Sequence, residues 1–402
     1  MSDLSASLTA LSATLFGSLR RADQRRWAEA YLLGLLVTQG KKSVRRMADT
    51  VSASPTAAQS MRQFICISPW DWGPVMRELT RWAEGHGPAT AWTIGRAVLP
   101  KRGDRSVGVH RYFDPFSGRT LNCQLGLGAF TCIGGIPVPV DWRLHLPTQW
   151  TEDPRQRRSV RIPDTVHYRP LWMQALELVD TLAAHDDVTP APVVADLSDS
   201  PDAGLFLRAL GRRGYEFAIA VPPALQVRLA VERPPGSTEF ATARSLLSSC
   251  GTPDDVRVTR ADGRRERIRV QSALVTPPGS GTTRLPERPH RLFTELLPDN
   301  RTGPLWMTNL TARPLADVAS LTELRAATEA SVATMARDFG LLDFEGRSLP
   351  GWYHHMALVS AAHAYRQLTP PPEIQHRRIY HSPRQSRTAA RAPRQRSGAS
   401  AP

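Results

Sequence analysis

The sequence predicts an α/β protein in which an all-helical region precedes a mixed sheet. Three observations predict this class. Apolar residues recur every three or four positions up to about residue 84, and four apolar runs divided by turn residues follow over 90–146. Residues 192–221 then read as strand, acid, helix and strand, an arrangement in which ligand chemistry lies at the carboxyl ends of the strands.

The composition indicates a polyanionic partner. The 402 residues carry 51 Lys and Arg against 37 Asp and Glu, a net charge of +14. Nucleic acid is the first candidate and an anionic membrane surface the second, while an arginine-rich composition without functional meaning is the alternative. The cysteines lack the spacing of a zinc site or a disulfide framework. With no signal segment and no apolar run of about 20 residues, we expect a cytoplasmic protein that does not enter a membrane.

An all-α domain is expected over residues 1–88. The apolar spacing predicts helices over 4–16, 24–37, 41–51 and 56–67, and another from about 69 to 84. Basic residues gather at the helix starts and connections, where cations can contact phosphates. The candidate DNA contacts here are Lys41, Lys42, Arg45 and Arg46. The alternative is a solvated basic face.

Residues 89–221 are expected to form the first part of the core. Strands are predicted at 92–99, 106–113, 120–130, 138–146, 192–196 and 215–221, helices at 171–184 and 203–210, and a polar loop at 155–161. The turn after the first strand contains Lys101 and Arg102, which are further candidate DNA contacts.

The remaining chain divides into three parts. Residues 222–300 are rich in proline and glycine and hold arginine-rich strands such as 267–274, which predicts an inserted β-rich subdomain. Strands at 290–297 and 304–309 and long helices at 315–339 and 352–368 lead back into the core, which ends over residues 301–370. Because no acid follows Glu373, residues 371–402 are predicted to be a disordered basic tail that strengthens binding to polyanions.

Several short segments, taken in order, resemble the DDE transposases of insertion sequences, specifically the "seven-oh-one" group. The segments are YLLGLL at 31–36, SPWD at 68–71, PKRG at 100–103, SVGV at 106–109, NCQ at 122–124, RLHLP at 143–147, VAD at 194–196, GLLDFEGR at 340–347 and GWYHH at 351–355. The resemblance runs from about residue 25 to 363 and is weak between 222 and 290.

The resemblance implies an RNase H-like core in which three carboxylates hold two Mg²⁺ or Mn²⁺ ions. Phosphodiester cleavage develops charge on the attacking and the leaving oxygen, and two hard cations about 4 Å apart stabilise both. Hard cations require oxygen ligands, which explains the use of Asp and Glu. The implied substrate is DNA, and the implied reaction is cleavage followed by strand transfer.

The resemblance also assigns the acidic positions. The first, before the Pro-Lys turn, is Gly95 in this chain, the second is Asp196, and the third is Glu329, with Arg325 four residues before it. Asp196, Arg325 and Glu329 are the expected catalytic residues, and the two acids are the expected metal ligands if the protein is active. Without the resemblance, Arg325 and Glu329 would read as a surface ion pair and Asp196 as a helix cap.

Other positions depart from the family pattern. Arg96 stands where a second acid often follows the first, Ala336 replaces an expected lysine, and an expected aromatic-glycine pair is absent at 197–200. Adjacent His354 and His355 point about 100° apart on a helix, which favours packing and polar contacts over a metal site.

These observations predict a transposase-family DNA-binding protein with impaired or absent strand transfer. Two alternatives stay open. One is an active transposase that uses a substitute carboxylate with Mg²⁺ or Mn²⁺, and the other is a non-enzymatic regulator or interaction protein with a basic surface. The expected partner is DNA rather than a membrane, and a homodimer is left open.

Overall fold

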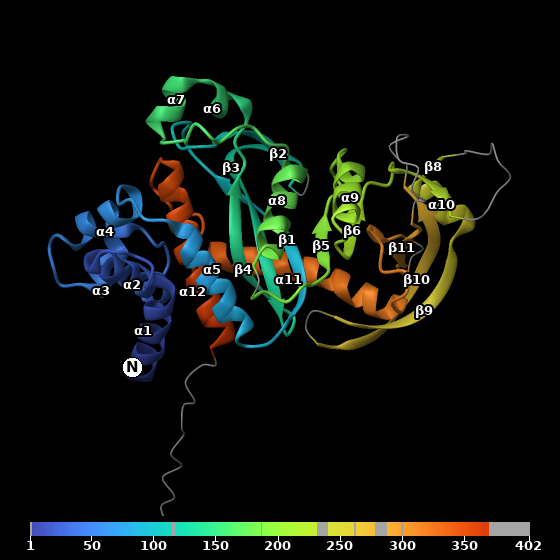
Figure 1. Cartoon of the computed structure of the whole chain (residues 1–402), viewed down its shortest axis with the longest axis horizontal. Coiled ribbons are helices and arrows are strands. Elements are labelled where there is room, and N and C mark those ends of the chain that lie inside the picture. Colours follow the sequence, from blue (N-terminus) through green and yellow to red (C-terminus); the bar gives the residue numbers. More distant parts are fainter. Residues whose placement is uncertain are drawn as a thin grey trace, which may run out of the picture. The chain divides into compact units, whose positions relative to one another are not determined.

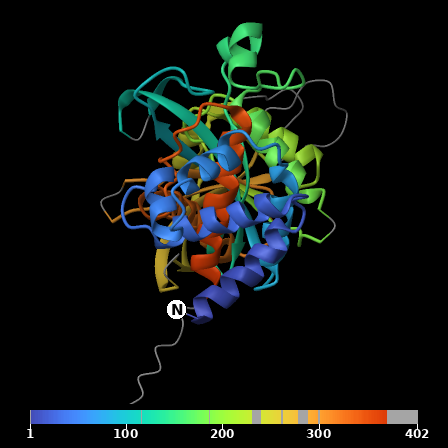
Figure 2. The ribbon, with the colours of Figure 1, turned by 90° about the vertical axis from the view of Figure 1, so that its left-hand side faces the viewer.

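Five helices occupy the first part of the chain, as the apolar spacing predicts (Figure 1). In the computed structural model they are α1 (Ser2–Phe16), α2 (Ala22–Val37), α3 (Val44–Val51), α4 (Ala57–Cys66) and α5 (Trp72–Glu84). Side chains cap two of their starts, since Ser43 accepts a hydrogen bond from the backbone N–H of Arg46 and Asp71 accepts one from Gly73. Figure 2 shows these helices in front of α12 (Leu349–Leu368), with which α2, α4 and α5 share a hydrophobic core.

The structure describes residues 2–114, 117–185, 187–230, 240–260, 263–277, 288–298 and 301–369. The predicted basic tail at 371–402 lies outside these residues. The described residues belong to one compact unit, and the domain boundaries proposed from the sequence stay predictions. Among the described residues, no helix has both the length and the apolar character that crossing a membrane requires.

The strand β1 (Ala89–Pro100) organises the first half of the sheet. It pairs antiparallel with β3 (Arg119–Ile133) on one side and parallel with β5 (Val193–Asp196) on the other. The short strand β2 (His110–Asp114) and β4 (Ile136–Leu144) both pair with β3, and β6 (Phe217–Val221) continues parallel to β5. The sheet is therefore mixed, as predicted, with its parallel strands ending near Asp196.

The region predicted to be an insertion extends this same sheet. After β6 the order is β12 (Leu305–Thr308), β11 (His290–Leu296), β10 (Arg265–Thr276), β7 (Gln226–Leu229) and β8 (Ala241–Thr242), with β9 (Thr252–Thr259) paired to β10. A short helix, α10 (Ala243–Cys250), packs on β7 and β10. The arginine-rich strand expected at 267–274 is thus part of β10.

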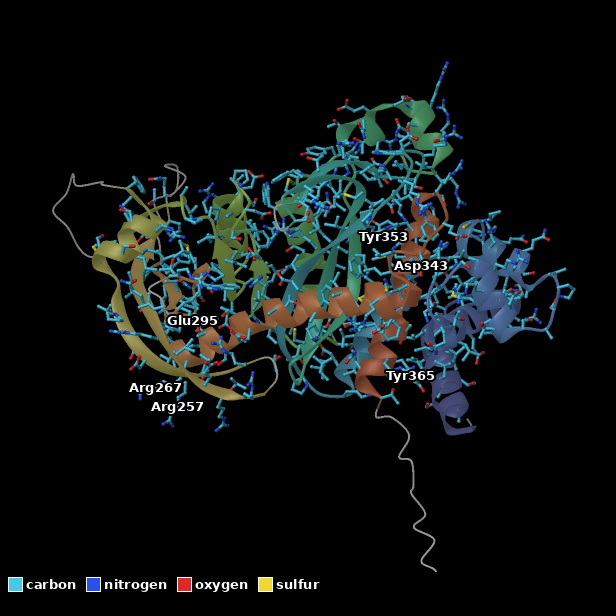
Figure 3. All side chains as sticks on the ribbon, turned by 180° about the vertical axis from the view of Figure 1, so that it is seen from behind. Arg257, Arg267, Glu295, Asp343, Tyr353 and Tyr365 are labelled. Atoms are coloured by element: carbon cyan, nitrogen blue, oxygen red, sulfur yellow. The ribbon has the colours of Figure 1, made fainter. Side chains whose placement is uncertain are left out.

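Helices cover both faces of the sheet. On the face toward the viewer in Figure 1 lie α8 (Leu171–Ala183) and α9 (Ala203–Arg212). On the opposite face, seen from behind in Figure 3, the long helix α11 (Leu315–Asp338) crosses β1 and β5 and reaches β9. This helix therefore packs across the sheet, from β1 and β5 to the extended part that contains β9.

The prediction of a polar loop at 155–161 is wrong. Two short helices, α6 (Thr148–Glu152) and α7 (Pro154–Ser159), occupy this region. Asp153 caps α7 by accepting hydrogen bonds from the backbone N–H groups of Arg155 and Gln156, and Pro154 fits the first helical position. Arg157 is buried and donates to the carbonyls of Thr151 and Pro163. This basic residue therefore stabilises the short helices instead of facing solvent in a loop.

Candidate functional site

A pocket of about 330 Å³ lies at the carboxyl end of β5. In the parallel register, Ile94 of β1 stands opposite Ala195 of β5, which places Gly95 beside Asp196. The helix α11 brings Arg325 and Glu329 to the same place, and all four residues line the pocket. The structure therefore brings together every residue that the sequence assigned to the catalytic centre.

One guanidinium lies between the two carboxylates of this pocket. Nη1 of Arg325 donates to Oε1 of Glu329 at 2.7 Å and lies 3.5 Å from Oδ2 of Asp196. The other oxygen of Asp196, Oδ1, accepts from the backbone N–H of Ser198 at 2.9 Å and from its hydroxyl at 2.6 Å. Asp196 therefore does not act as a helix cap. The ion pair of Arg325 with Glu329, which reads as a surface contact in the sequence, also includes Asp196, whose side chain is only 14% exposed.

The position that the resemblance assigns to the first acid is filled by packing. A Cβ placed on Gly95 would lie 2.8 Å from Cγ2 of Thr328 and 3.0 Å from Cε2 of Phe130. Gly95 pairs across the sheet with Gly128, and a Cβ on Gly128 would lie 2.9 Å from the same atom of Phe130. The phenyl ring therefore covers both glycines, and there is no room for a carboxylate at residue 95 without movement of its neighbours.

Hydrogen bonds hold Thr328 in this place. Its hydroxyl donates to the carbonyl of Leu324 at 2.7 Å and accepts from the hydroxyl of Thr93, the two oxygens being 2.6 Å apart. Thr328 is β-branched and buried, so its Cγ2 has little freedom to move away. Phe130 is also fully buried, with its ring edge-on to Trp142.

A second arginine lies on the wall of the pocket. Nη1 of Arg96 donates to Oδ2 of Asp199 at 2.6 Å, and the two side chains are 19% and 28% exposed. Burial alone would lower the pKa of Arg96, but the hydrogen bond and the charge of Asp199 raise it above its ordinary value. The guanidinium stays charged, and Asp199 is held by it.

The residues present do not fit the two-metal centre that the resemblance implies. Only two of the three assigned positions hold a carboxylate, and both of these already contact Arg325. The cations of Arg96 and Arg325 line the same pocket, where they repel a divalent ion. Within the described ranges, no cluster of three or more His, Cys, Asp or Glu side chains is arranged to hold a metal ion.

The candidate DNA contacts separate into exposed and buried groups. Lys41, Arg45, Arg46 and Arg102 are exposed, although Nζ of Lys41 lies 3.7 Å from Oε1 of Glu345. Arg46 also donates to the carbonyl of Gln39. Exposure leaves these four side chains available to a partner.

Lys42 and Lys101 are corrected to structural roles. Lys42 is buried, and its ammonium donates to the carbonyl of Thr38. Nζ of Lys101 donates to the carbonyl of Phe344 at 3.1 Å. Burial lowers the pKa of both groups. The backbone N–H of Lys42 donates to Oδ2 of Asp343 at 2.7 Å. Both lysines are therefore joined to the 343–344 region, Lys42 through its backbone and Lys101 through its ammonium.

The histidine pair forms packing and polar contacts, as predicted. The ring nitrogens of His354 lie 3.1 Å from the carbonyl oxygen of Ile65 and 2.8 Å from that of Trp70. Those of His355 lie 2.9 Å from the hydroxyl of Tyr31 and 3.0 Å from the carbonyl oxygen of Gly340. Both histidines join α12 to neighbouring elements.

Sequence reasoning missed the partner of Arg96. Asp199 reads as a loop residue in the sequence, yet it neutralises an arginine that projects from a largely buried strand. A buried arginine requires a carboxylate, and the loop after the neighbouring strand is where one would be sought. Phe130 and Thr328 give no comparable signal, because both are ordinary core residues in their own elements.

A larger pocket, of about 530 Å³, lies between α5, β4 and α8. Its lining includes the stacked rings of Trp72 and Tyr353 and the ion pair of Arg143 with Asp141. It contains none of the residues assigned to the catalytic centre. The smaller pocket is the better candidate, because it gathers the two assigned carboxylates.

Comparison with known families covers the first two of the assigned positions. A family model described as DDE superfamily endonuclease matches residues 14–269, more than half of the 402 residues. A search of curated proteins found no match to the chain. The matched region includes Gly95 and Asp196 and ends before α11, so Arg325 and Glu329 rest on the geometry and on the sequence resemblance.

Proposed function

We propose, from the premise that the chain belongs to the DDE superfamily of endonucleases, that it is a transposase-derived DNA-binding protein without strand-transfer activity. Members of this superfamily act on DNA and typically use divalent metal ions. We further assign it to the "seven-oh-one" group of insertion-sequence enzymes and interpret the sheet around β1, β3 and β5 as its RNase H-like core. The ordered segments from 31–36 to 351–355 support this assignment.

One observation supports the proposed loss of activity. At residue 95, the position that we assign to the first metal-binding carboxylate, Phe130 and Thr328 occupy the space that a side chain would need. A missing side chain that left an open space could be replaced by water or by a neighbouring acid. Here the space is closed, and the closing residues are themselves fixed by hydrogen bonds and burial.

The remaining acids support the same conclusion. Arg325 supplies a permanent positive charge between Asp196 and Glu329, so one of their two negative charges is balanced without a metal. A divalent ion would have to displace a guanidinium that is hydrogen-bonded at 2.7 Å. We infer that the pocket now stabilises the contact between α11 and β5.

Asp199 favours a second candidate, an active enzyme with a substitute carboxylate. This residue lines the same pocket and would bring the number of acids there to three, with Asp196 and Glu329. Its bond to Arg96 at 2.6 Å opposes this role, because metal binding would break that ion pair.

Metal-dependent nicking of a duplex that carries the ends of the element tests the proposal. With Mg²⁺ or Mn²⁺ present, we expect binding but no cleavage by the full-length protein. Cleavage that is abolished by Asp196→Ala would overturn the proposal. Cleavage that is also abolished by Asp199→Asn, with the nearby Asp202→Asn variant active, would establish the substitute-carboxylate mechanism.

The basic composition supports DNA as the partner. Contacts with phosphates release counterions, so affinity for DNA should fall steeply as salt rises. The exposed cations at Lys41, Arg45, Arg46 and Arg102 are the proposed contacts. Absent or salt-insensitive binding would favour the non-enzymatic interaction protein with a different partner.

A further inference from the structure

The arginine-rich sequence between residues 257 and 269 folds into one antiparallel ribbon. β9 and β10 pair from Thr252 opposite Ser272 to Thr259 opposite Arg265. Because side chains alternate between the two faces of a strand, the register determines which residues share a face. The two faces of this ribbon differ in chemistry.

The inner face is apolar. Val256 and Val258 of β9 and Ile268 and Val270 of β10 are buried in one cluster with residues of α11, including Val318. The backbone N–H of Thr259 also donates to the hydroxyl of Ser320 on α11, at 3.0 Å. Packing against a long helix makes this face part of the folded core.

The outer face carries four exposed arginines. Arg257 stands directly opposite Arg267, and Arg265 and Arg269 are the next outward-facing residues of β10 on either side. Arg267 pairs with Asp255 at 2.9 Å. Among the residues that the structure describes, Arg257, Arg265 and Arg269 form no ion pair. We call this face the arginine ribbon.

Figure 3 shows Arg257 and Arg267 pointing outward from the ribbon. Like charges directly opposite each other across two strands destabilise the pair. With one acid for four cations, the face has an unbalanced charge of three, and an external polyanion would relieve the repulsion.

A partly buried cation fixes the end of the ribbon. The guanidinium of Arg260, 23% exposed, contacts Glu266 at 2.8 Å, Glu295 of β11 at 2.9 Å and Glu323 of α11 at 2.8 Å. These contacts tie the ribbon to two other elements. The outward arginines are thus held on a rigid support, which lowers the entropy lost on binding.

We propose that the arginine ribbon is a binding surface for duplex DNA, in addition to the cations of the N-terminal helices. β11 pairs with β10 from Arg269 onward, so the described strands at Arg257, Arg265 and Arg267 form a two-stranded ribbon. Such a ribbon fits the major groove of B-DNA, and arginine contacts phosphates and base edges there. The proposal rests on the proposed function, since it names a surface through which a transposase-derived protein would hold DNA. It assigns a binding role to the extension of the sheet between β6 and α11.

Paired variants test this surface in the full-length protein. Arg257→Gln with Arg269→Gln removes two unpaired charges from the ribbon. Arg155→Gln with Arg158→Gln removes two exposed charges from α7, which lies far from β9 in Figure 1. Binding to a short labelled duplex of arbitrary sequence is measured at several salt concentrations, and the thermal melting temperature verifies folding.

We expect the ribbon variant to bind about tenfold or more weakly at low salt and its salt slope to fall by about 0.9 for each phosphate that the ribbon no longer neutralises. The α7 variant should stay within about twofold of the unaltered protein, because its two arginines lie outside the arginine ribbon. Arg257→Lys with Arg269→Lys should recover most of the affinity, since it keeps the charge. That recovery distinguishes a missing charge from a disturbed fold.

The two hypotheses fail in different ways. If the unaltered protein binds DNA with a steep salt slope and the ribbon variant behaves identically, the ribbon is overturned and the proposed function stands. If the unaltered protein does not bind DNA, both fall. If ribbon-dependent binding is seen with anionic phosphatidylserine vesicles and not with the duplex, the surface recognises a membrane, and the DNA proposal is overturned.

Discussion

Gly95 and Thr328 lie so close that a Cβ on the glycine would be 2.8 Å from Cγ2 of the threonine. Residues far apart in the chain thus close the position that we propose for the first acid of the superfamily. The packed core therefore excludes a carboxylate at residue 95. Restoring the acid alone should not restore a metal site.

Substituting Gly95 by alanine should destabilise the fold. Overpacking of a buried site costs about 1–3 kcal/mol, and neither Thr328 nor Phe130 is a flexible side chain that could move aside. Thr328→Ser, which removes Cγ2 and keeps the hydroxyl, should recover part of this stability in the double variant. Denaturant unfolding of the four proteins gives the coupling free energy, which we expect to reach about 1 kcal/mol.

Gly211 provides the matched control for this substitution. It lies in α9, and a Cβ there would meet nothing within 4 Å. Gly211→Ala should be neutral or stabilising by up to about 1 kcal/mol, because alanine favours the helix. Equal effects at residues 95 and 211 would contradict the packing argument.

Removing the guanidinium of Arg325 should create a weak Mn²⁺ site. One unit charge about 4 Å away contributes roughly 4 kcal/mol at an effective dielectric constant near 20, so Arg325→Ala should bind Mn²⁺ at least tenfold more tightly. Electron paramagnetic resonance of free Mn²⁺ measures this directly. Arg325→Lys should bind Mn²⁺ no better than the unaltered protein, and adding Asp196→Asn to Arg325→Ala should remove the gain.

Tight Mn²⁺ binding by the unaltered protein would contradict this prediction. It would mean that Arg325 leaves the carboxylates when a metal arrives, and that Asp196 and Glu329 retain their superfamily role. The same measurement on Asp199→Asn would then show whether a third acid takes part.

The sequence predicted the main elements well, because their patterns are local. Apolar periodicity placed the strand at 92–99 inside β1 and the helix at 315–339 on α11. The two acids that the sequence assigned, Asp196 and Glu329, lie in one pocket. They could be assigned because spacing and resemblance locate a strand end and a helix face.

Contacts between residues far apart in the chain could not be predicted from local sequence patterns. Lys42 reads as a surface cation in the sequence, but its side chain packs against Gly340 and its backbone N–H donates to Asp343, both in a distant part of the chain. Asp199 and Arg96 are 103 residues apart. No local spacing encodes such pairs, and the loop predicted at 155–161 failed because one buried arginine, Arg157, organises a short helix.

Acid should destabilise the protein through the histidines of α12. Burial lowers the pKa of His354, His355 and His363 from 6.5 to about 4 in the folded state. Below pH 6.5 the unfolded chain therefore binds more protons than the folded one, so stability falls as pH drops from about 6.5 to 4. Unfolding midpoints in denaturant, measured across this range, should decline steadily.

His363 allows a sharper test, because neither ring nitrogen has a hydrogen-bond partner among the described residues. Replacing it by leucine should remove the burial penalty of an unsatisfied polar group, about 1–3 kcal/mol, and raise stability at pH 7. The decline in acid should also become shallower by one proton. His355→Leu, which leaves Tyr31 and Gly340 unpaired, is the control and should destabilise.

Neutralising exposed and buried cations of the N-terminal helices should affect DNA binding differently. Arg45→Gln with Arg46→Gln removes charges that face solvent, so affinity should fall several-fold and the salt slope should decrease by about one or two. Lys42→Met removes a charge that is buried against Thr38, so affinity should stay within about twofold. Fluorescence anisotropy with a labelled duplex measures both. Weaker binding by the Lys42 variant at an unchanged melting temperature would show that this lysine reaches DNA, and would return it to the contact surface.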